Sequence, residues 1–166
     1  GGTIGTEDCG KVTPDGYTLG IISIAHAVNP ALHTLKYDPI KSFTPISILA
    51  TGPNVLVVSE DAPFKTVKEL VAAAKANPGK LNYASAGIGS FQHLGGELFK
   101  LEAGVDIVHV PYKGGGPAMQ DEVAGHVKII FSSMIQTTPL IKAGTVRVLG
   151  TGGSKRSPVL PAVPTI

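Results

Sequence analysis

The residues best placed to do chemistry lie between positions 85 and 93, where a loop of small side chains leads into a helical pattern. Ser90 is the predicted N-cap of that helix, and a helix start leaves its first backbone N–H groups without an intrahelical partner. The helix dipole adds about half a positive charge at the same end. This combination favours the binding of a carboxylate without lysine or arginine. The candidate binding residues are Ser85, Ala86, Gly87, Gly89, Ser90, Phe91, Gln92 and His93.

A nucleotide is the main alternative occupant of a glycine-rich loop of this kind. Gly87-x-Gly89-x-x-Gln92 matches the first two glycines of the dinucleotide fingerprint, but Gln92 stands where the third glycine belongs. The next strand ends at Val110 without the acidic residue that would bind a ribose. The phosphate-binding motif GxxxxGK[ST] is absent. A structural role, in which the glycines only let strand and helix pack closely, stays open.

The sequence contains no local signature of covalent or metal catalysis. It has no Gly-x-Ser-x-Gly elbow, so Ser23 and Ser90 are not expected to be nucleophiles. The single cysteine, Cys9, lies in a glycine-rich segment and is expected to be a small packing residue. The five histidines form no HxH or HExxH pair, so we predict neither a metal nor a cofactor.

Three histidines nevertheless have informative positions. His93 falls in the first turn of the helix beside the loop, where it would either donate a hydrogen bond to a ligand or have a structural role. Its place one turn before Glu97 is more typical of a helix-surface hydrogen bond than of a metal site. For His26 the loop context favours ligand contact. His109 lies in an apolar strand and is expected to be a hydrogen-bonded core residue.

Composition and charge exclude several classes of protein. With 43% hydrophobic and 16% charged residues, the 166-residue chain has a globular and not a disordered composition. The net charge is only +2, and the 14 lysines and arginines are scattered, so we do not expect nucleic-acid binding. Apolar runs such as residues 54–58 are too short to cross a bilayer. The first residues lack the pattern of a signal peptide, as in a mature protein or a piece of one.

The elements that must position the loop alternate between helices and strands. The clearest helix begins at the capping box of Thr66 and Glu69 and ends before residues 77–79. A second helix is expected over residues 91–102, a third from Pro117 at its first position, and a short one over residues 139–143. Strands are expected at residues 17–23, 43–50, 54–59, 81–84, 106–110, 127–132 and 145–151.

This alternation predicts an α/β protein in which helices cover both faces of a parallel sheet. Ligands bind such sheets beyond the carboxyl ends of the strands. Three predicted loops follow strand ends and are rich in small polar residues, namely residues 23–29, 85–92 and 132–138. We therefore expect a binding site where these loops meet.

Eight short stretches, in order along the whole chain, carry a resemblance to a known family. They are IGTE at residues 4–7, PDGYTL at 14–19, NPAL at 29–32, YDP at 37–39, PNVLVV at 53–58, NPGKLNYAS at 77–85, HVPYKG at 109–114 and KRSP at 155–158. Each is weak alone, but together they resemble the extracytoplasmic solute receptors of tripartite tricarboxylate transport systems, also called the Bug family.

The resemblance implies a type II periplasmic binding protein fold, in which two α/β lobes close on a small organic acid. Residues 1–50 and 150–166 would form part of lobe one, and residues 51–149 would form lobe two. The crossings between the lobes would lie near residues 51–53 and 149–151, where glycine can absorb hinge rotation. It also implies that the family's first strand and first ligand loop precede Gly1, and that the last third of the protein follows Ile166.

The resemblance also assigns ligand loops in both lobes. In lobe one they correspond to Ser23, Ala25 and His26, and in lobe two to the stretch from Ser85 to His93 and to Ser133, Met134 and Gln136. Family members receive a carboxylate there through backbone N–H groups, hydroxyls and waters. Phe91 and Met134 depart from the usual pattern and would make the distal pocket more apolar, or suited to a ring.

The function implied is that of a monomeric periplasmic receptor that delivers a small carboxylate to the subunits of a membrane transporter. No catalytic residue, metal or cofactor is expected. Two alternatives remain open at this point. One is an enzyme acting on a small carboxylic acid with His26 or His93 as general acid or base. The other is the ligand-sensing domain of a transcription regulator.

Overall fold

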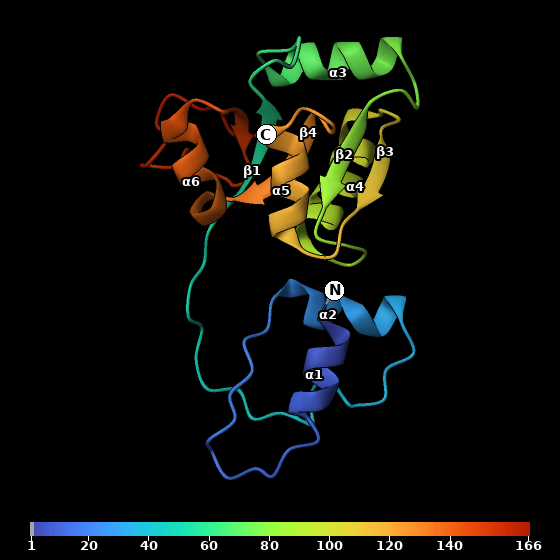
Figure 1. Cartoon of the computed structure of the whole chain (residues 1–166), viewed down its shortest axis with the longest axis vertical. Helices are drawn as coiled ribbons and strands as arrows, with labels where there is room; N and C mark the ends of the chain where they lie inside the picture. Colours follow the sequence, from blue (N-terminus) through green and yellow to red (C-terminus); the bar gives the residue numbers. More distant parts are fainter. Residues whose placement is uncertain (1) are drawn as a thin grey trace.

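The computed structural model describes residues 2–166, and at its centre is a five-stranded sheet in the order β3-β2-β4-β1-β5 (Figure 1). β2 pairs in parallel with β3 and β4, whereas β1 runs antiparallel to both β4 and β5. The expected parallel arrangement is thus right for β2, β3 and β4 and wrong for β1. The reason is the chain path, because β1 enters the sheet at the end where β4 leaves it. The strands are β1 (Asn54–Ser59), β2 (Asn82–Ser85), β3 (Val108–Pro111), β4 (Ile129–Ser133) and β5 (Val146–Thr151).

Helices cover both faces of the sheet, as expected. One face packs against Leu70 and Ala74 of α3 and Phe99 of α4, and the other against Ala118 of α5 and Leu140 of α6. Figure 1 shows α1 and α2 apart from the sheet, at the other end of the molecule. The helices are α1 (Thr3–Cys9), α2 (Ile24–Leu32), α3 (Val67–Ala76), α4 (Phe91–Ala103), α5 (Gly115–Val123) and α6 (Met134–Ala143).

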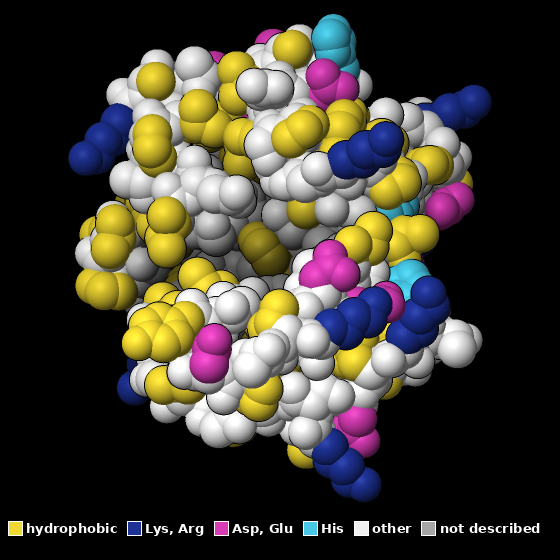
Figure 2. Space-filling model, turned by 60° about the horizontal axis from the view of Figure 1, so that its bottom comes forward, with side chains coloured by type: hydrophobic (Ala, Val, Ile, Leu, Met, Phe, Trp, Pro, Cys, Tyr) yellow, Lys and Arg dark blue, Asp and Glu magenta, His cyan; other side chains and the backbone are white. Residues whose placement is uncertain are grey.

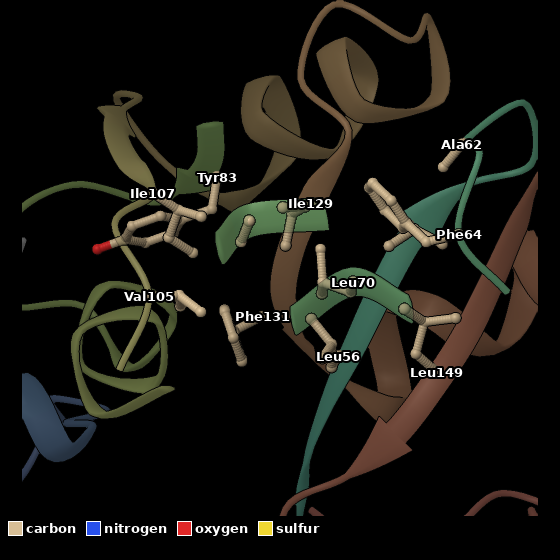
Figure 3. Close-up of a cluster of buried hydrophobic side chains, with 12 residues drawn as sticks. Leu56, Ala62, Phe64, Leu70, Tyr83, Val105, Ile107, Ile129, Phe131 and Leu149 are labelled. Carbon is tan, nitrogen blue, oxygen red and sulfur yellow. The ribbon is translucent and has the colours of Figure 1, made fainter. Parts of the chain in front are cut away.

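The larger core cluster lies between the sheet and the helices α3 and α4 (Figure 3). Tyr83 of β2 is fully buried there, and its hydroxyl donates a hydrogen bond of 2.7 Å to Glu97 Oε1. A Cβ at Gly96 of α4 would overlap the Tyr83 ring. The glycine therefore lets α4 pack directly on the sheet. This contact sets the distance between the sheet and the start of α4, which follows the 85–90 loop.

The start of α3 confirms the predicted capping box. Thr66 Oγ1 accepts the N–H of Glu69 at 3.1 Å, and Glu69 Oε2 in turn accepts the N–H of Lys65 at 2.7 Å. The return bond goes to the residue before the cap and not to the cap itself. One N–H of the helix start, that of Glu69, is therefore satisfied by the cap, and the second bond fixes the residue that leads into the helix.

Three helix starts differ from the expectation. Residues 24–30, expected as a loop, form most of α2, since the Ser23 side chain caps a helix that carries Pro30 only in its last turn. α5 starts at Gly115, so Pro117 is its third residue and not its first. α6 starts at Met134, so the expected loop at residues 132–138 is largely helix and the expected start at Pro139 lies inside it.

Two expected strands, at residues 17–23 and 43–50, are absent from the described chain. Their apolar side chains are exposed, and Tyr17 and Ile48 keep 93% and 82% of their surface. A strand needs a neighbouring strand to satisfy its backbone. Within residues 2–166 no strand lies beside either segment, so their sequence pattern alone does not make them strands.

The C-terminal residues lie against the sheet. Thr165 forms a parallel bridge with Thr151 of β5, and the N–H of Ile166 donates to Thr151 O at 3.0 Å. We call residues 54–166 the sheet part and residues 2–53 the N-terminal part. The division into lobes with hinges near residues 51–53 and 149–151 remains a proposal. None of the helices in residues 2–166 is both long and apolar enough to span a membrane.

Candidate functional site

The loop of residues 85–90 joins the carboxyl end of β2 to the start of α4. Its backbone turns sharply at Gly87, with φ of 114°, and at Gly89, with φ of 78°. A Cβ on Gly87 would also come within 3.2 Å of Tyr112 O, at the end of the neighbouring strand β3. Positive φ is strained for residues other than glycine, so both glycines are needed for this loop shape.

Three backbone N–H groups of the loop are used by the loop itself. Gly87 N–H donates to Ser85 Oγ at 3.0 Å, and Ser90 N–H donates to Gly87 O at 3.1 Å. Gly89 N–H donates to Nδ1 of His93 at 3.3 Å. The expectation that Gly87 and Gly89 serve the ligand therefore applies to their backbone shape, because their own N–H groups point into the loop.

The N–H groups left for an anion belong to the first turn of α4. Ser90 is the N-cap, as predicted, and its Oγ accepts the N–H of His93 at 3.3 Å. No acceptor within residues 2–166 receives the N–H of Phe91 or that of Gln92. Two free donors at a helix start, with the positive end of the dipole behind them, are suited to binding an anion.

Two histidines support the loop from behind. The rings of His93 and His109 lie 4.3 Å apart, and His109 Nε2 is 2.6 Å from Ser85 Oγ. His109 also stacks on the ring of Tyr83 at 5.0 Å. Burial, and then the nearby His93, lower the pKa of His109, which favours its neutral form. Of the two roles left open for His93, the structural one is the role that its Nδ1 has here.

The N-terminal part brings a second capped helix start. Ser23 Oγ accepts the N–H of Ala25 at 3.3 Å, and Ser23 O accepts the N–H of His26 at 2.9 Å. The His26 ring lies between Tyr37 and Phe43, and its Nε2 is 2.7 Å from the carbonyl oxygen of Pro39. A carbonyl only accepts, so Nε2 carries the proton and the side chain is held within its own part of the molecule.

α2 approaches the 85–90 loop directly. A Cβ on Gly89 would lie 3.1 Å from Leu32 Cδ1 and 3.3 Å from Asn29 Oδ1. The molecular surface is hollowed between the two parts, with a hydrophobic side chain at the floor of the hollow (Figure 2). The start of α4 therefore lies close to where the two parts meet.

The third predicted loop contributes in a different way. Ser133 Oγ caps α6 by accepting the N–H of Gln136 at 3.4 Å. The amides of Gln136 and of Gln92 both approach Gly115, where a Cβ would lie 2.9 Å and 3.4 Å from their Nε2 atoms. The starts of α4, α5 and α6 therefore meet at one edge of the sheet. Sequence reasoning missed Gly115, although the run of three glycines from Gly114 marks a close approach.

Two predicted site residues have other surroundings. Met134 is half-buried and packs against the second core cluster, with Val55 and Ile130, so its side chain serves the core. Phe91 is half-buried at the first position of α4. No group of three histidine, cysteine, aspartate or glutamate side chains among the described residues is arranged to hold a metal ion.

Comparison with known proteins places these features in context. Residues 1–166 match the family described as tripartite tricarboxylate transporter family receptor. A protein encoded in the tcbD–tcbE intergenic region of Pseudomonas sp. strain P51 is 41% identical over 167 residues, which cover 100% of this chain and 50% of the relative. The chain thus spans about half the length of the relatives it matches.

Two solved structures are similar throughout the chain. Rpa4515 of R. palustris, with adipate, is 37% identical with a TM-score of 0.95, and MatC of Rhodopseudomonas palustris, with bound malate, is 32% identical with a TM-score of 0.89. Each match covers 99% of this chain and 56% of the other. A likeness of this extent confirms the expected α/β fold of a periplasmic binding protein, of which the chain spans a part.

Proposed function

The chain belongs to the tripartite tricarboxylate transporter receptor family, and we propose that it captures a small organic carboxylate and delivers it to a membrane transporter. The proposal places the protein in the periplasm, as a monomer that binds no nucleic acid. It assigns no catalytic step. The structures of related proteins that hold adipate and malate support a carboxylate as the ligand class.

The observation that carries the proposal is the pair of free N–H groups on Phe91 and Gln92, at the Ser90-capped start of α4. Both are positioned by the hydrogen bonds of Ser90 and His93, which hold the loop and the first turn of α4 together. The start of α2, capped by Ser23, is the corresponding candidate on the N-terminal part. A carboxylate between them would be bound by dipoles and not by a salt bridge.

We further propose that binding brings the two parts together by rotation near residues 51–53, the segment that joins them. Residues 149–151, expected as the second crossing, lie in β5, which pairs with β1 inside the sheet part. Residues 50–53 have no regular secondary structure, which leaves their backbone dihedral angles free to change. The close contact of Gly89 with Asn29 and Leu32 supports a closed arrangement in which the 85–90 loop packs against α2.

Calorimetric titration with adipate, malate and acetate tests the proposal, with ATP as the contrasting ligand. We expect heat of binding from at least one of the acids and none from the nucleotide. Binding of ATP together with no binding of any of the three acids would overturn the proposal.

Two substitutions at one position isolate the backbone donor. Proline suits the first position of a helix and removes its N–H, and Ser90, with φ of −67° and ψ of 158°, already has the conformation that a following proline requires. Phe91→Ala removes the ring and keeps the N–H. We expect Phe91→Pro to bind about tenfold more weakly than Phe91→Ala, since a hydrogen bond to a charged group is worth roughly 1.5–3 kcal/mol.

The structure adds no observation in favour of an enzyme built on the two histidines. His93 Nδ1 accepts a backbone N–H, and His26 Nε2 donates to a backbone carbonyl. Each ring therefore has a backbone partner that orients it, which is the arrangement of a structural histidine.

A further inference from the structure

The hydrogen bond between Gly89 and His93 places a condition on the protonation of His93. Gly89 N–H is the donor and Nδ1 of His93 the acceptor, at 3.3 Å. Nδ1 can accept only with a free lone pair, so the ring is neutral and its proton is on Nε2. An imidazolium has N–H groups at both nitrogens and no acceptor, and it would therefore set two donors against each other at this point.

Few changes in the ring's position are open to it. His93 stands on α4 with its ring 4.3 Å from that of His109, which is held in turn by Ser85 and Tyr83. Glu97, one turn further along α4, already accepts hydrogen bonds from Tyr83 and from Lys100. Rotation of His93 away from Gly89 would disturb this packing. When the hydrogen bond breaks, we therefore expect the 85–90 loop to move and the His93 ring to stay in place.

The charged and titratable groups around His93 come from three elements. β3 contributes His109, β2 contributes Tyr83, and α4 itself contributes Glu97 and Lys100. α2 approaches the loop through Asn29 and Leu32, which are uncharged. Because His93 and His109 lie so close, a proton on one ring opposes a proton on the other, and burial, followed by the nearby His93, lowers the pKa of His109.

We propose that His93 is a positioning residue that keeps the 85–90 loop in its carboxylate-binding shape only while its Nδ1 is unprotonated. The inference rests on the proposed function for its biological meaning, because the loop is the one to which we assign the carboxylate. Protonation of His93 releases Gly89 N–H, and with it the turn that presents the N–H groups of Phe91 and Gln92.

An opposing effect must be weighed, since an imidazolium beside the site would also attract an anion. That attraction acts over several ångströms of partly hydrated space and is offset by the Glu97 carboxylate one turn away. The loss at Gly89 acts at direct contact. We therefore expect ligand affinity to fall, and not to rise, as the pH drops through the range in which histidine is protonated.

The first experiment follows the backbone amide resonance of Gly89 in the ligand-free protein by NMR, across the titration range of histidine. We expect this resonance to shift with the same midpoint as the His93 ring. His93→Asn puts an amide oxygen near the position of Nδ1 and does not titrate, so its Gly89 resonance should stay constant. His126→Ala, on the exposed far side of the sheet part, should behave as wild type. A Gly89 resonance that ignores the His93 titration would overturn the proposal.

The second experiment measures adipate affinity at about pH 7.5 and about pH 5.5, on either side of the ordinary histidine pKa. Wild type should lose roughly tenfold at the lower pH, the equivalent of about one hydrogen bond. His93→Asn should bind similarly at both, and His93→Ala weakly at both. Stronger wild-type binding at low pH would contradict the proposal. Absence of adipate binding at either pH, with an intact Gly89 titration, would count against the proposed ligand class and would leave the His93 hydrogen bond supported.

Discussion

Gly89 and Asn29 are in contact across the two parts of the molecule, since a Cβ on Gly89 would lie only 3.3 Å from Asn29 Oδ1. Asn29 is itself buried, with 1% of its surface exposed. Gly89 thus meets two demands at once, a backbone φ of 78° and a close approach by α2. The same residue donates its N–H to His93, so the contact between the parts and the binding loop share one backbone position.

Gly89→Ala should weaken carboxylate binding and leave the protein more open. The added methyl group would press on Asn29 and on Leu32. Alanine in the left-handed backbone conformation would lower the stability by roughly a further 1–2 kcal/mol. Gly125→Ala is the matched control, because Gly125 has a φ of 75° and its Cβ would meet only the ends of two side chains, those of Lys128 and Asp61. We expect both variants to lose stability, but only Gly89→Ala to show a larger radius of gyration and weaker binding. Equal binding by the two variants would contradict this role of Gly89.

Ser90→Ala should reduce both stability and binding. Loss of an N-cap side chain costs about 1 kcal/mol, because the N–H of His93 loses its acceptor. Thr66→Ala removes the equivalent cap from α3, whose start is fully separate from the loop. Urea unfolding should show similar losses in the two variants, and calorimetry should show weaker carboxylate binding only for Ser90→Ala. A Thr66→Ala variant that bound equally weakly would show that general loosening, and not the α4 start, sets affinity.

Gly96→Ala should be among the more damaging single-methyl additions in the sheet part. Its Cβ would overlap the fully buried Tyr83 ring, so α4 would have to move away from the sheet. We expect a loss of about 2 kcal/mol or more, in the range for overpacked cores. Gly116→Ala in α5 is the control, since nothing lies within 4 Å of its Cβ and alanine favours a helix. Thermal unfolding should separate the two variants, with Gly116→Ala at or above the wild-type midpoint.

Glu122 should make the protein less stable as the pH rises from about 4.5 to about 8. The carboxyl group is fully buried on α5 without a hydrogen-bond partner among the described residues, and burial raises its pKa to about 8. The folded state therefore keeps a proton that the unfolded state has lost above its ordinary value of 4.5. Between these two values the free energy of unfolding falls as the pH rises, by at most about 1.4 kcal/mol per pH unit.

Glu122→Gln removes this dependence, because an amide has no proton to lose. Urea unfolding between about pH 5 and pH 8 should show a falling stability for wild type and a flatter profile for Glu122→Gln. Glu102→Gln, at an exposed position of α4, should keep the wild-type slope. An unchanged slope in Glu122→Gln would mean that another group is responsible.

Local sequence signals predicted the elements that depend on local contacts. The start of α3 at Thr66 and the start of α4 at Ser90 follow from side chains that bond to their own first turn. The parallel strands around the binding loop follow from alternation with helices. By contrast, the antiparallel direction of β1 depends on the end of the sheet at which the preceding chain enters. The periodicity of residues within a strand does not predict that path.

Two kinds of feature were out of reach of the sequence. Residues 17–23 have the apolar pattern of a strand, but pairing is a property of two segments and not of one. Residues 23–29 were expected as a loop because they follow a predicted strand, yet the Ser23 side chain starts a helix there and proline is tolerated near its end. The Gly89–His93 bond depends on a side-chain rotamer and a loop turn together, so residue types alone left the role of His93 undecided.

The position of β1 has a consequence for how the sheet part is assembled on the ribosome. β1 is made early, but both its neighbours come from much later in the chain, with Val55 opposite Ser132 on one side and Thr151 on the other. β1, which lies beside the central strand β4, therefore stays unpaired during synthesis until β4 and β5 have emerged. Closing such long loops makes folding slow compared with local hairpins. The apolar β1 segment has no strand partner throughout that interval, and exposed apolar segments of this kind favour aggregation until the later strands cover them.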